Sequence, residues 1–172
     1  MLKKIAGKIF GFEREIAELQ KRIRELSWDT SFDMWTRAAF LNFCDIMPRS
    51  LRVLVFIDMD RIAFLNKELG YEEVNRRVRD TFSVPFRRSD IVARWYSGDE
   101  IVILFDADLD AAQHKANELE ASAAAQDLSF TYNIGEWDVG NEEVEDAIER
   151  LANEVLKKKK NSHHRQATDD AL

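Results

Sequence analysis

Two apolar runs constrain the fold of this chain most strongly: LRVLVFI at 51–57 and IVILF at 101–105. Both are nearly continuous and rich in β-branched residues, which is typical of strands inside a sheet. A third apolar run, RSDIVARW at 88–95, is separated from the second by YSGDE, so these two are predicted to form a β-hairpin. The segment 128–137, LSFTYNIGEW, alternates as a fourth strand.

Helical segments are expected between and after these strands. They are a short helix from about Thr36 to Pro48, a long one from near Asp60 to about Phe82, an alanine-rich one from Asp110 to Gln126, and a last one from Asn141 to about Lys160. The resulting order of elements predicts an α+β fold, with a ferredoxin-like βαββαβ core. In this prediction the helices cover one face of an antiparallel sheet.

The N-terminal segment carries apolar residues at alternating steps of four and three. They are Ile5, Ile9, Phe12, Ile16, Leu19, Ile23 and Leu26. Isoleucine at the first heptad position with leucine at the fourth favours a parallel two-stranded coiled coil. Two alternatives stay open, a helix packed on its own domain and a helix lying on a membrane surface. The predicted division is a coiled-coil helix over 1–27, a domain over 28–160 and a disordered tail over 161–172.

Composition narrows the classes of function. The 172 residues carry a net charge of −7, which argues against binding to a nucleic-acid polymer but allows a nucleotide held through a metal ion. Cys44 is the only cysteine, so an internal disulfide is excluded and a reducing compartment is expected. The longest apolar runs have about five residues, against roughly 20 in a membrane-spanning helix. We expect a cytoplasmic protein without membrane contact.

Acidic residues follow the first strand and occupy the hairpin tip. Asp58 ends the strand, and Asp99 lies in the turn after Gly98, which allows a tight backbone. If the first strand lies beside the hairpin, the two carboxylates converge. Together with the main-chain carbonyl of Met59 they suit an oxygen-preferring cation such as Mg²⁺. Either signal alone also fits an ordinary turn or a helix cap.

Five motifs in order resemble the GGDEF domain of diguanylate cyclases across nearly all of residues 28–160. They are DTSFDMWTRAAF (29–40), DMDRIAFLNKELGY (58–71), SGDEI (97–101), TYNIG (131–135) and ANEVLKKKK (152–160). The resemblance implies that a homodimer, holding one GTP in each subunit, condenses two GTP into cyclic di-GMP and two pyrophosphates. It also implies Mg²⁺ or Mn²⁺ as the cofactor.

The resemblance assigns roles by position. Asp58, Asp99 and the Met59 carbonyl would bind the metal, and Glu100 would assist by metal binding or proton transfer. The residues implied at the nucleotide are Ser97 and Gly98 in the signature, Asn66 at the guanine edge, Asn75 near the base and Lys160 at the terminal phosphates.

Two departures from the family pattern concern the nucleotide. Ala63 stands where the family has a phosphate-binding lysine, and Arg61 is a nearby substitute. Asn75 stands where the family has an aspartate that reads guanine. An amide offers one acceptor and one donor, so Asn75 could accept one guanine proton or could face adenine.

Two further features lie before the signature. Arg87 and Asp90 resemble the RxxD product-inhibition site, which implies cyclic di-GMP as an inhibitor; an exposed turn is the alternative. One extra residue between Arg94 and Ser97 predicts a bulge at the hairpin end. Besides a cyclase, the departures leave open a degenerate domain that binds nucleotide or cyclic dinucleotide without catalysis, and a cyclase with relaxed choice between guanine and adenine.

Overall fold

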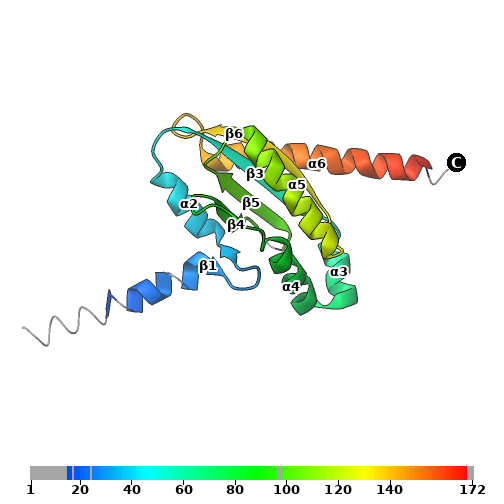
Figure 1. Ribbon diagram of the computed structural model, residues 1–172, viewed down its shortest axis with the longest axis horizontal. Coiled ribbons are helices and arrows are strands. Elements are labelled where there is room, and N and C mark those ends of the chain that lie inside the picture. The colour runs from blue at the N-terminus through cyan, green and yellow to red at the C-terminus, as the bar shows by residue number, and fades with distance from the viewer. Residues whose placement is uncertain (1–14, 17, 24, 97, 170–172) are drawn as a thin grey trace, which may run out of the picture.

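The computed structural model describes residues 15–169 except 17, 24 and 97. Its elements, in chain order, are β1 Trp28–Asp29, β2 Met34–Trp35, α2 Arg37–Asp45, β3 Leu51–Met59, α3 Ile62–Leu69, α4 Tyr71–Thr81, β4 Ile91–Arg94, β5 Glu100–Phe105, α5 Leu109–Ala125, β6 Phe130–Asp138 and α6 Val144–Asp169 (Figure 1). No helix in this described part is long and apolar enough to cross a membrane.

A six-stranded sheet in the order β1-β2-β4-β5-β3-β6 forms the centre of the domain (Figure 1). Strand β3 lies between β5 and β6, and β4 pairs with β5; all three pairings are antiparallel. This is the ferredoxin-like arrangement that the sequence predicted. The short strands β1 and β2, which the sequence did not indicate, extend the sheet beyond β4 through one parallel pairing.

Helices cover both faces of the sheet, so the prediction of one covered face is wrong. From β3, Val55 and Ile57 pack in the core that contains residues of α3, α4 and α5. Leu54 and Phe56 pack in a second core with residues of α2 and α6. A nearly continuous apolar strand is typical of burial on both faces, and this explains the second layer.

Two of the helix predictions are wrong, one in its continuity and one in its end. The long helix expected from Asp60 to Phe82 is two helices, α3 and α4, which meet at Gly70. Gly70 has a φ of +83°, which glycine adopts easily and other residues only at a cost in free energy. The chain can therefore change direction at Gly70. The last helix continues to Asp169 instead of ending near residue 160. No proline or glycine lies between 161 and 169 to stop it.

The hairpin before the signature stays in register instead of forming the predicted bulge. Pairing runs without interruption from Ile91 with Leu104 to Arg94 with Ile101. The next position closes with a hydrogen bond of 2.8 Å from the Trp95 N–H to the main-chain oxygen of Glu100. The extra residue therefore lengthens the loop between residues 95 and 100. Ser97, within this loop, lies outside the described residues.

The described part of the N-terminal segment is helical and turns its apolar side to solvent. Ile16, Leu19, Ile23 and Leu26 are 53%, 54%, 62% and 68% exposed. These residues therefore do not pack on their own domain, which was one of the alternatives. The earlier seam positions, from Ile5 to Phe12, lie outside the described residues. The coiled coil stays a prediction for this chain.

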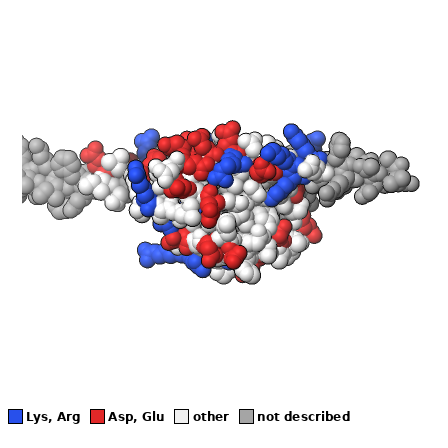
Figure 2. Space-filling view, turned by 90° about the horizontal axis from the view of Figure 1, so that it is seen from above, with Lys and Arg blue, Asp and Glu red and all other residues white. Residues whose placement is uncertain are grey.

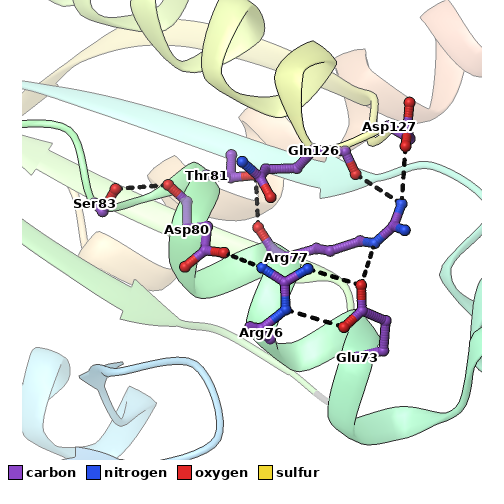
Figure 3. Close-up of polar contacts among 8 residues, drawn as sticks. All are labelled: Glu73, Arg76, Arg77, Asp80, Thr81, Ser83, Gln126 and Asp127. Atoms are coloured by element: carbon purple, nitrogen blue, oxygen red, sulfur yellow. Dashed lines mark hydrogen bonds and ion pairs between the residues drawn. The ribbon is translucent and has the colours of Figure 1, made fainter.

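Helix α4 is tied to the turn before β6 by an arginine (Figure 3). The Arg77 guanidinium donates to Oε1 of Glu73 at 2.8 Å, to the main-chain oxygen of Gln126 at 3.0 Å and to Oδ2 of Asp127 at 3.2 Å. Arg76 also donates to Glu73. Hydrogen bonds from Arg76 and Arg77 lower the pKa of the Glu73 carboxyl to about 2. This network fixes α4 against the rest of the domain.

Replacement of this arginine should destabilise the domain measurably. We expect Arg77→Ala to lower the free energy of unfolding by about 1–2 kcal/mol, because the Gln126 carbonyl loses its charged donor. Arg76→Ala is the matched control; it removes exposed ion pairs to Glu73 and Asp80, which contribute little, and should cost less. Urea unfolding followed by circular dichroism measures both. Equal losses in the two variants would contradict this role for Arg77.

Candidate functional site

The carboxylates that the sequence singled out lie together at one end of the sheet. Asp58 in β3 pairs in register with Glu100, the first residue of β5, and with Thr131 on the opposite neighbour β6. The next N–H along β3, that of Met59, donates to the main-chain oxygen of Asp99 at 2.8 Å. This bond holds the hairpin loop against the end of β3. The predicted convergence of Asp58 with Asp99 therefore follows from strand pairing.

The hairpin carboxylates are partly withdrawn from water and close to other negative charge. Burial, together with the charge of Asp58, raises the pKa of Asp99. Burial and the charges of Asp58 and Asp99 raise the pKa of Glu100. Oε2 of Glu100 is buried and has no hydrogen-bond partner within the described structure. A buried oxygen without a partner is uncommon, and here it is available to a ligand or a proton.

A lysine of α6 supplies the positive charge at this edge. Its ammonium lies 2.7 Å from Oδ1 of Asp58 and 2.9 Å from Oδ1 of Asp60. Burial opposes the charged form of Lys159, but the hydrogen bonds to both carboxylates outweigh it and raise the pKa of Lys159. Asp60 also accepts from the hydroxyls of Ser129 and Thr131. Asp58 and Asp60 therefore both have hydrogen-bond partners at this end of the sheet.

The lysine at the site is Lys159, whereas the motif placed it at Lys160. The phase of α6 explains the difference. Ile148, Leu151 and Val155 are buried against the sheet, and Lys159 continues this stripe four residues later. Lys160 lies one position further round the helix and is exposed. Figure 2 shows basic side chains gathered at the end of the domain from which α6 projects. Helical periodicity could have identified Lys159 from the sequence.

The oxygen atoms at this site are of the type that binds hard divalent cations. Asp58, Asp99 and Glu100 offer carboxylate oxygens, and Met59 offers a main-chain carbonyl; such oxygens are the ligands of Mg²⁺ and Mn²⁺. Within the described ranges, however, no three acidic, histidine or cysteine side chains are arranged as a ready metal site. Oδ1 of Asp58 instead bonds Lys159. The residues therefore fit the ion by chemistry, with one oxygen already engaged.

The helices that follow β3 carry the predicted nucleotide residues. Asn66 in α3 is half-buried, and its side-chain oxygen is buried without a hydrogen-bond partner in the described structure. Asn75 in α4 is also half-buried. Arg61, the predicted substitute for the lysine missing at Ala63, is exposed and places its guanidinium 4.6 Å from the ring centre of Phe64. Its side chain is therefore engaged with its own helix.

The predicted product-inhibition pair forms a turn. The Arg87 N–H donates to Oδ2 of Asp90 at 2.9 Å, and the Asp90 N–H donates to the Arg87 carbonyl at 3.0 Å. The same two residues line a hollow of about 310 Å³ together with Phe86, Phe105 and Lys115. The local turn is what the alternative interpretation expected. The basic and aromatic side chains of the hollow are compatible with a ligand. Binding of cyclic di-GMP by Arg87 and Asp90 stays a prediction.

Sequence reasoning missed the residue that supports the hairpin tip. The guanidinium of Arg37, at the start of α2, lies 4.6 Å from the ring centre of Trp95 and 4.8 Å from that of Tyr96. The same group hydrogen-bonds Glu145 at the start of α6. Arg37 therefore links two helices to the loop that carries Asp99. Arg37 belongs to the motif at 29–40, which was the signal that the sequence offered. A sequence motif does not show which aromatic rings a guanidinium contacts.

Comparison with known proteins agrees with the motifs. No family model matches the chain. It is 29% identical over 133 residues to Probable diguanylate cyclase DgcE of Escherichia coli (strain K12), a match that covers 69% of this chain and 12% of that protein. The chain thus spans about an eighth of the length of that relative.

Solved structures share the fold. The coiled coil and GGDEF domain of DgcB from Caulobacter crescentus, in complex with c-di-GMP, matches with a TM-score of 0.78 and 16% identity, over 92% of this chain and 93% of that one. Diguanylate cyclase SiaD from Pseudomonas aeruginosa, in complex with its activator SiaC, matches with a TM-score of 0.70 and 18% identity, over 93% and 68%. The chain has the fold of GGDEF domains, and its resemblance to this family is confirmed.

Proposed function

We propose that this chain, which has the GGDEF-domain fold, is a metal-dependent nucleotidyl cyclase of the cytoplasm that condenses two GTP into cyclic di-GMP. The observation that carries the proposal is the meeting of Asp58, Asp99 and Glu100 at one end of the sheet. Two of these carboxylates have raised pKa values in a partly buried environment, a feature typical of catalytic sites.

The reaction balances without any further reactant. The 3′-hydroxyl of each GTP loses its proton and attacks the α-phosphorus of the other. In each of the two attacks one O–P bond forms, the bond between the α-phosphorus and the oxygen bridging to the β-phosphate breaks, and pyrophosphate leaves. A divalent cation held by Asp58, Asp99 and the Met59 carbonyl would lower the pKa of the hydroxyl and offset charge on the phosphoryl group. Glu100, whose Oε2 has no partner in the described structure, is placed to accept the hydroxyl proton or to complete the ligand set.

Binding and orientation of the nucleotide would come from α3 and α4. The N–H groups at the start of α3 lie directly after Asp60 and suit a phosphate group. The unsatisfied oxygen of Asn66 can accept an N–H from the guanine edge. Asn75 would add one weaker, uncharged contact. Because Ala63 provides no charge to the phosphates, we expect modest affinity for GTP.

The reaction needs two half-sites that face one another, and we propose a homodimer formed through the N-terminal helix. The apolar side of the described part of this helix is exposed, from Ile16 to Leu26. Isoleucine and leucine at alternating heptad positions favour two parallel strands. The DgcB structure contains a coiled coil together with a GGDEF domain, which supports a coiled coil in this chain.

A second candidate is a domain of this fold that binds nucleotide or cyclic dinucleotide without catalysis. The observation that favours it is the bond from Lys159 to Asp58, which engages a proposed metal ligand. The absence of a phosphate-binding lysine at position 63 agrees with it. In this case cyclic di-GMP would act as a signal, with Arg87 and Asp90 as the candidate contacts.

One experiment separates the two candidates. The purified chain is incubated with Mg²⁺ or Mn²⁺ and with each nucleoside triphosphate, singly and in pairs, and the products are identified by mass spectrometry. We expect cyclic di-GMP from GTP and none after chelation of the metal. If no mixture yields a dinucleotide while calorimetry detects GTP or cyclic di-GMP binding, the second candidate replaces the first.

Base choice depends on Asn75. An amide lacks the charged acceptor that an aspartate offers to two guanine protons, so discrimination against adenine should be reduced. We expect GTP to be the better substrate and equimolar ATP to give some mixed product. Asn75→Asp should raise the preference for GTP by about tenfold, the equivalent of one charge-assisted hydrogen bond.

The measurement is the product ratio from equal GTP and ATP. Glu72→Gln, the opposite change at an exposed position of the same helix, is the control and should leave the ratio as in the wild type. A ratio that is the same for the wild type and Asn75→Asp would show that Asn75 does not read the base.

A further inference from the structure

The ammonium of Lys159 lies between two carboxylates, that of Asp58 in β3 and that of Asp60 just after this strand. The ammonium hydrogen-bonds Oδ1 of Asp58 at 2.7 Å and lies 2.9 Å from Oδ1 of Asp60. All three side chains are largely shielded from water, with exposed fractions of 21%, 18% and 27% for Lys159, Asp58 and Asp60. The position of Lys159 on the buried stripe of α6 directs it here.

A divalent cation and this ammonium would compete for the same oxygen. Mg²⁺ binds carboxylate oxygens at about 2.1 Å and demands near-octahedral geometry. With the ammonium hydrogen-bonded to Oδ1 of Asp58, an ion on that oxygen would lie within a few ångströms of another positive charge. Repulsion at this separation is strong where water is partly excluded. A metal ion bound to Oδ2 of Asp58 would be repelled by the ammonium of Lys159 in the same way.

We propose that Lys159 is an internal cation that competes with the divalent metal for Asp58. The inference rests on the proposed function, since it concerns the same site. In the metal-free protein the lysine offsets part of the negative charge of Asp58 and Asp60. Metal binding then requires the Lys159 side chain to leave Asp58. The apparent metal affinity is therefore the intrinsic affinity multiplied by the fraction of molecules in which the lysine has left.

The test uses Mn²⁺ alone with the nucleotide-free full chain. Free Mn²⁺ is followed by electron paramagnetic resonance during titration of the wild type, Lys159→Met and Lys160→Met. Methionine keeps most of the aliphatic stem and removes the charge. We expect Lys159→Met to bind Mn²⁺ at least about tenfold more tightly than the wild type. Lys160→Met, the same change at the exposed neighbour, should bind as the wild type does.

A second measurement guards against a change in folding. Circular dichroism first establishes that each variant is folded, and Lys159→Gln replaces Lys159→Met if the latter is not. Without metal, Lys159→Met should have a lower Tm than Lys160→Met, because Asp58 and Asp60 then face each other without a cation. Saturating Mn²⁺ should raise the Tm of Lys159→Met by more than it raises that of the wild type.

The outcomes separate this inference from the proposed function. Equal or weaker Mn²⁺ binding by Lys159→Met overturns the competition, whether or not the chain makes a dinucleotide. Tighter binding by Lys159→Met supports the competition even if no nucleotide mixture yields product, in which case the cyclase activity alone is contradicted. If no variant binds Mn²⁺ and none makes product, both are overturned.

Discussion

Asp58→Asn and Asp99→Asn should each reduce the rate of cyclic di-GMP formation by about 100-fold or more. Both substitutions keep the size of the side chain and remove its charge. Loss of groups that only support metal ligands costs 10–100-fold in affinity or activity, so the loss of a ligand should cost at least the upper end of this range. Without the ion, neither the 3′-hydroxyl nor the α-phosphate is activated.

The rate is measured with excess GTP and saturating Mg²⁺, and again with Mn²⁺. Asp110→Asn, the same change at an exposed position of α5, is the control and should keep the wild-type rate. Asp58→Asn also removes a partner of Lys159, so circular dichroism must show that the variant is folded. Rates within a few-fold of the wild type for folded Asp58→Asn and Asp99→Asn would show that these carboxylates do not hold a catalytic metal.

The fold could be predicted where burial alone determines structure. The two β-branched runs predicted β3 and β5, and the order of elements predicted the antiparallel core. Burial of both faces of β3 was also implied by its continuous apolar run, but strand patterns do not show how many helical layers a sheet carries. Gly70 was a signal for the break between α3 and α4, although a glycine within a helical pattern does not by itself end the helix.

The site could be predicted only where it depends on strand pairing. Asp58 and Glu100 face each other because β3 and β5 are neighbours, and the topology required this. Lys159 was missed because the motif fixes a position along the chain, whereas the direction of a side chain depends on the phase of α6. Arg37 was missed for a related reason, since its contact with Trp95 depends on tertiary packing.

Ile16→Glu combined with Leu19→Glu should convert a dimer of this protein into a monomer and reduce cyclase activity far more than GTP binding. In the described structure both side chains are more than half exposed, and they lie on the stripe that continues to Ile23 and Leu26. Burial of such a side chain in a dimer contributes about 1.5–3 kcal/mol, and a charge in its place opposes burial. Each monomer would keep its own nucleotide contacts but would lack a facing half-site.

Multi-angle light scattering at tens of micromolar measures the mass, and calorimetry measures GTP binding. Lys21 and Glu25 form an exposed ion pair that does not lie on the apolar stripe. The control variant, Lys21→Glu with Glu25→Lys, exchanges these two charges and should stay dimeric and active. A wild-type monomer at this concentration would contradict the coiled-coil dimer. A charged variant that is monomeric yet fully active at low concentration would contradict the need for two facing half-sites, because a single subunit would then complete both attacks on its own.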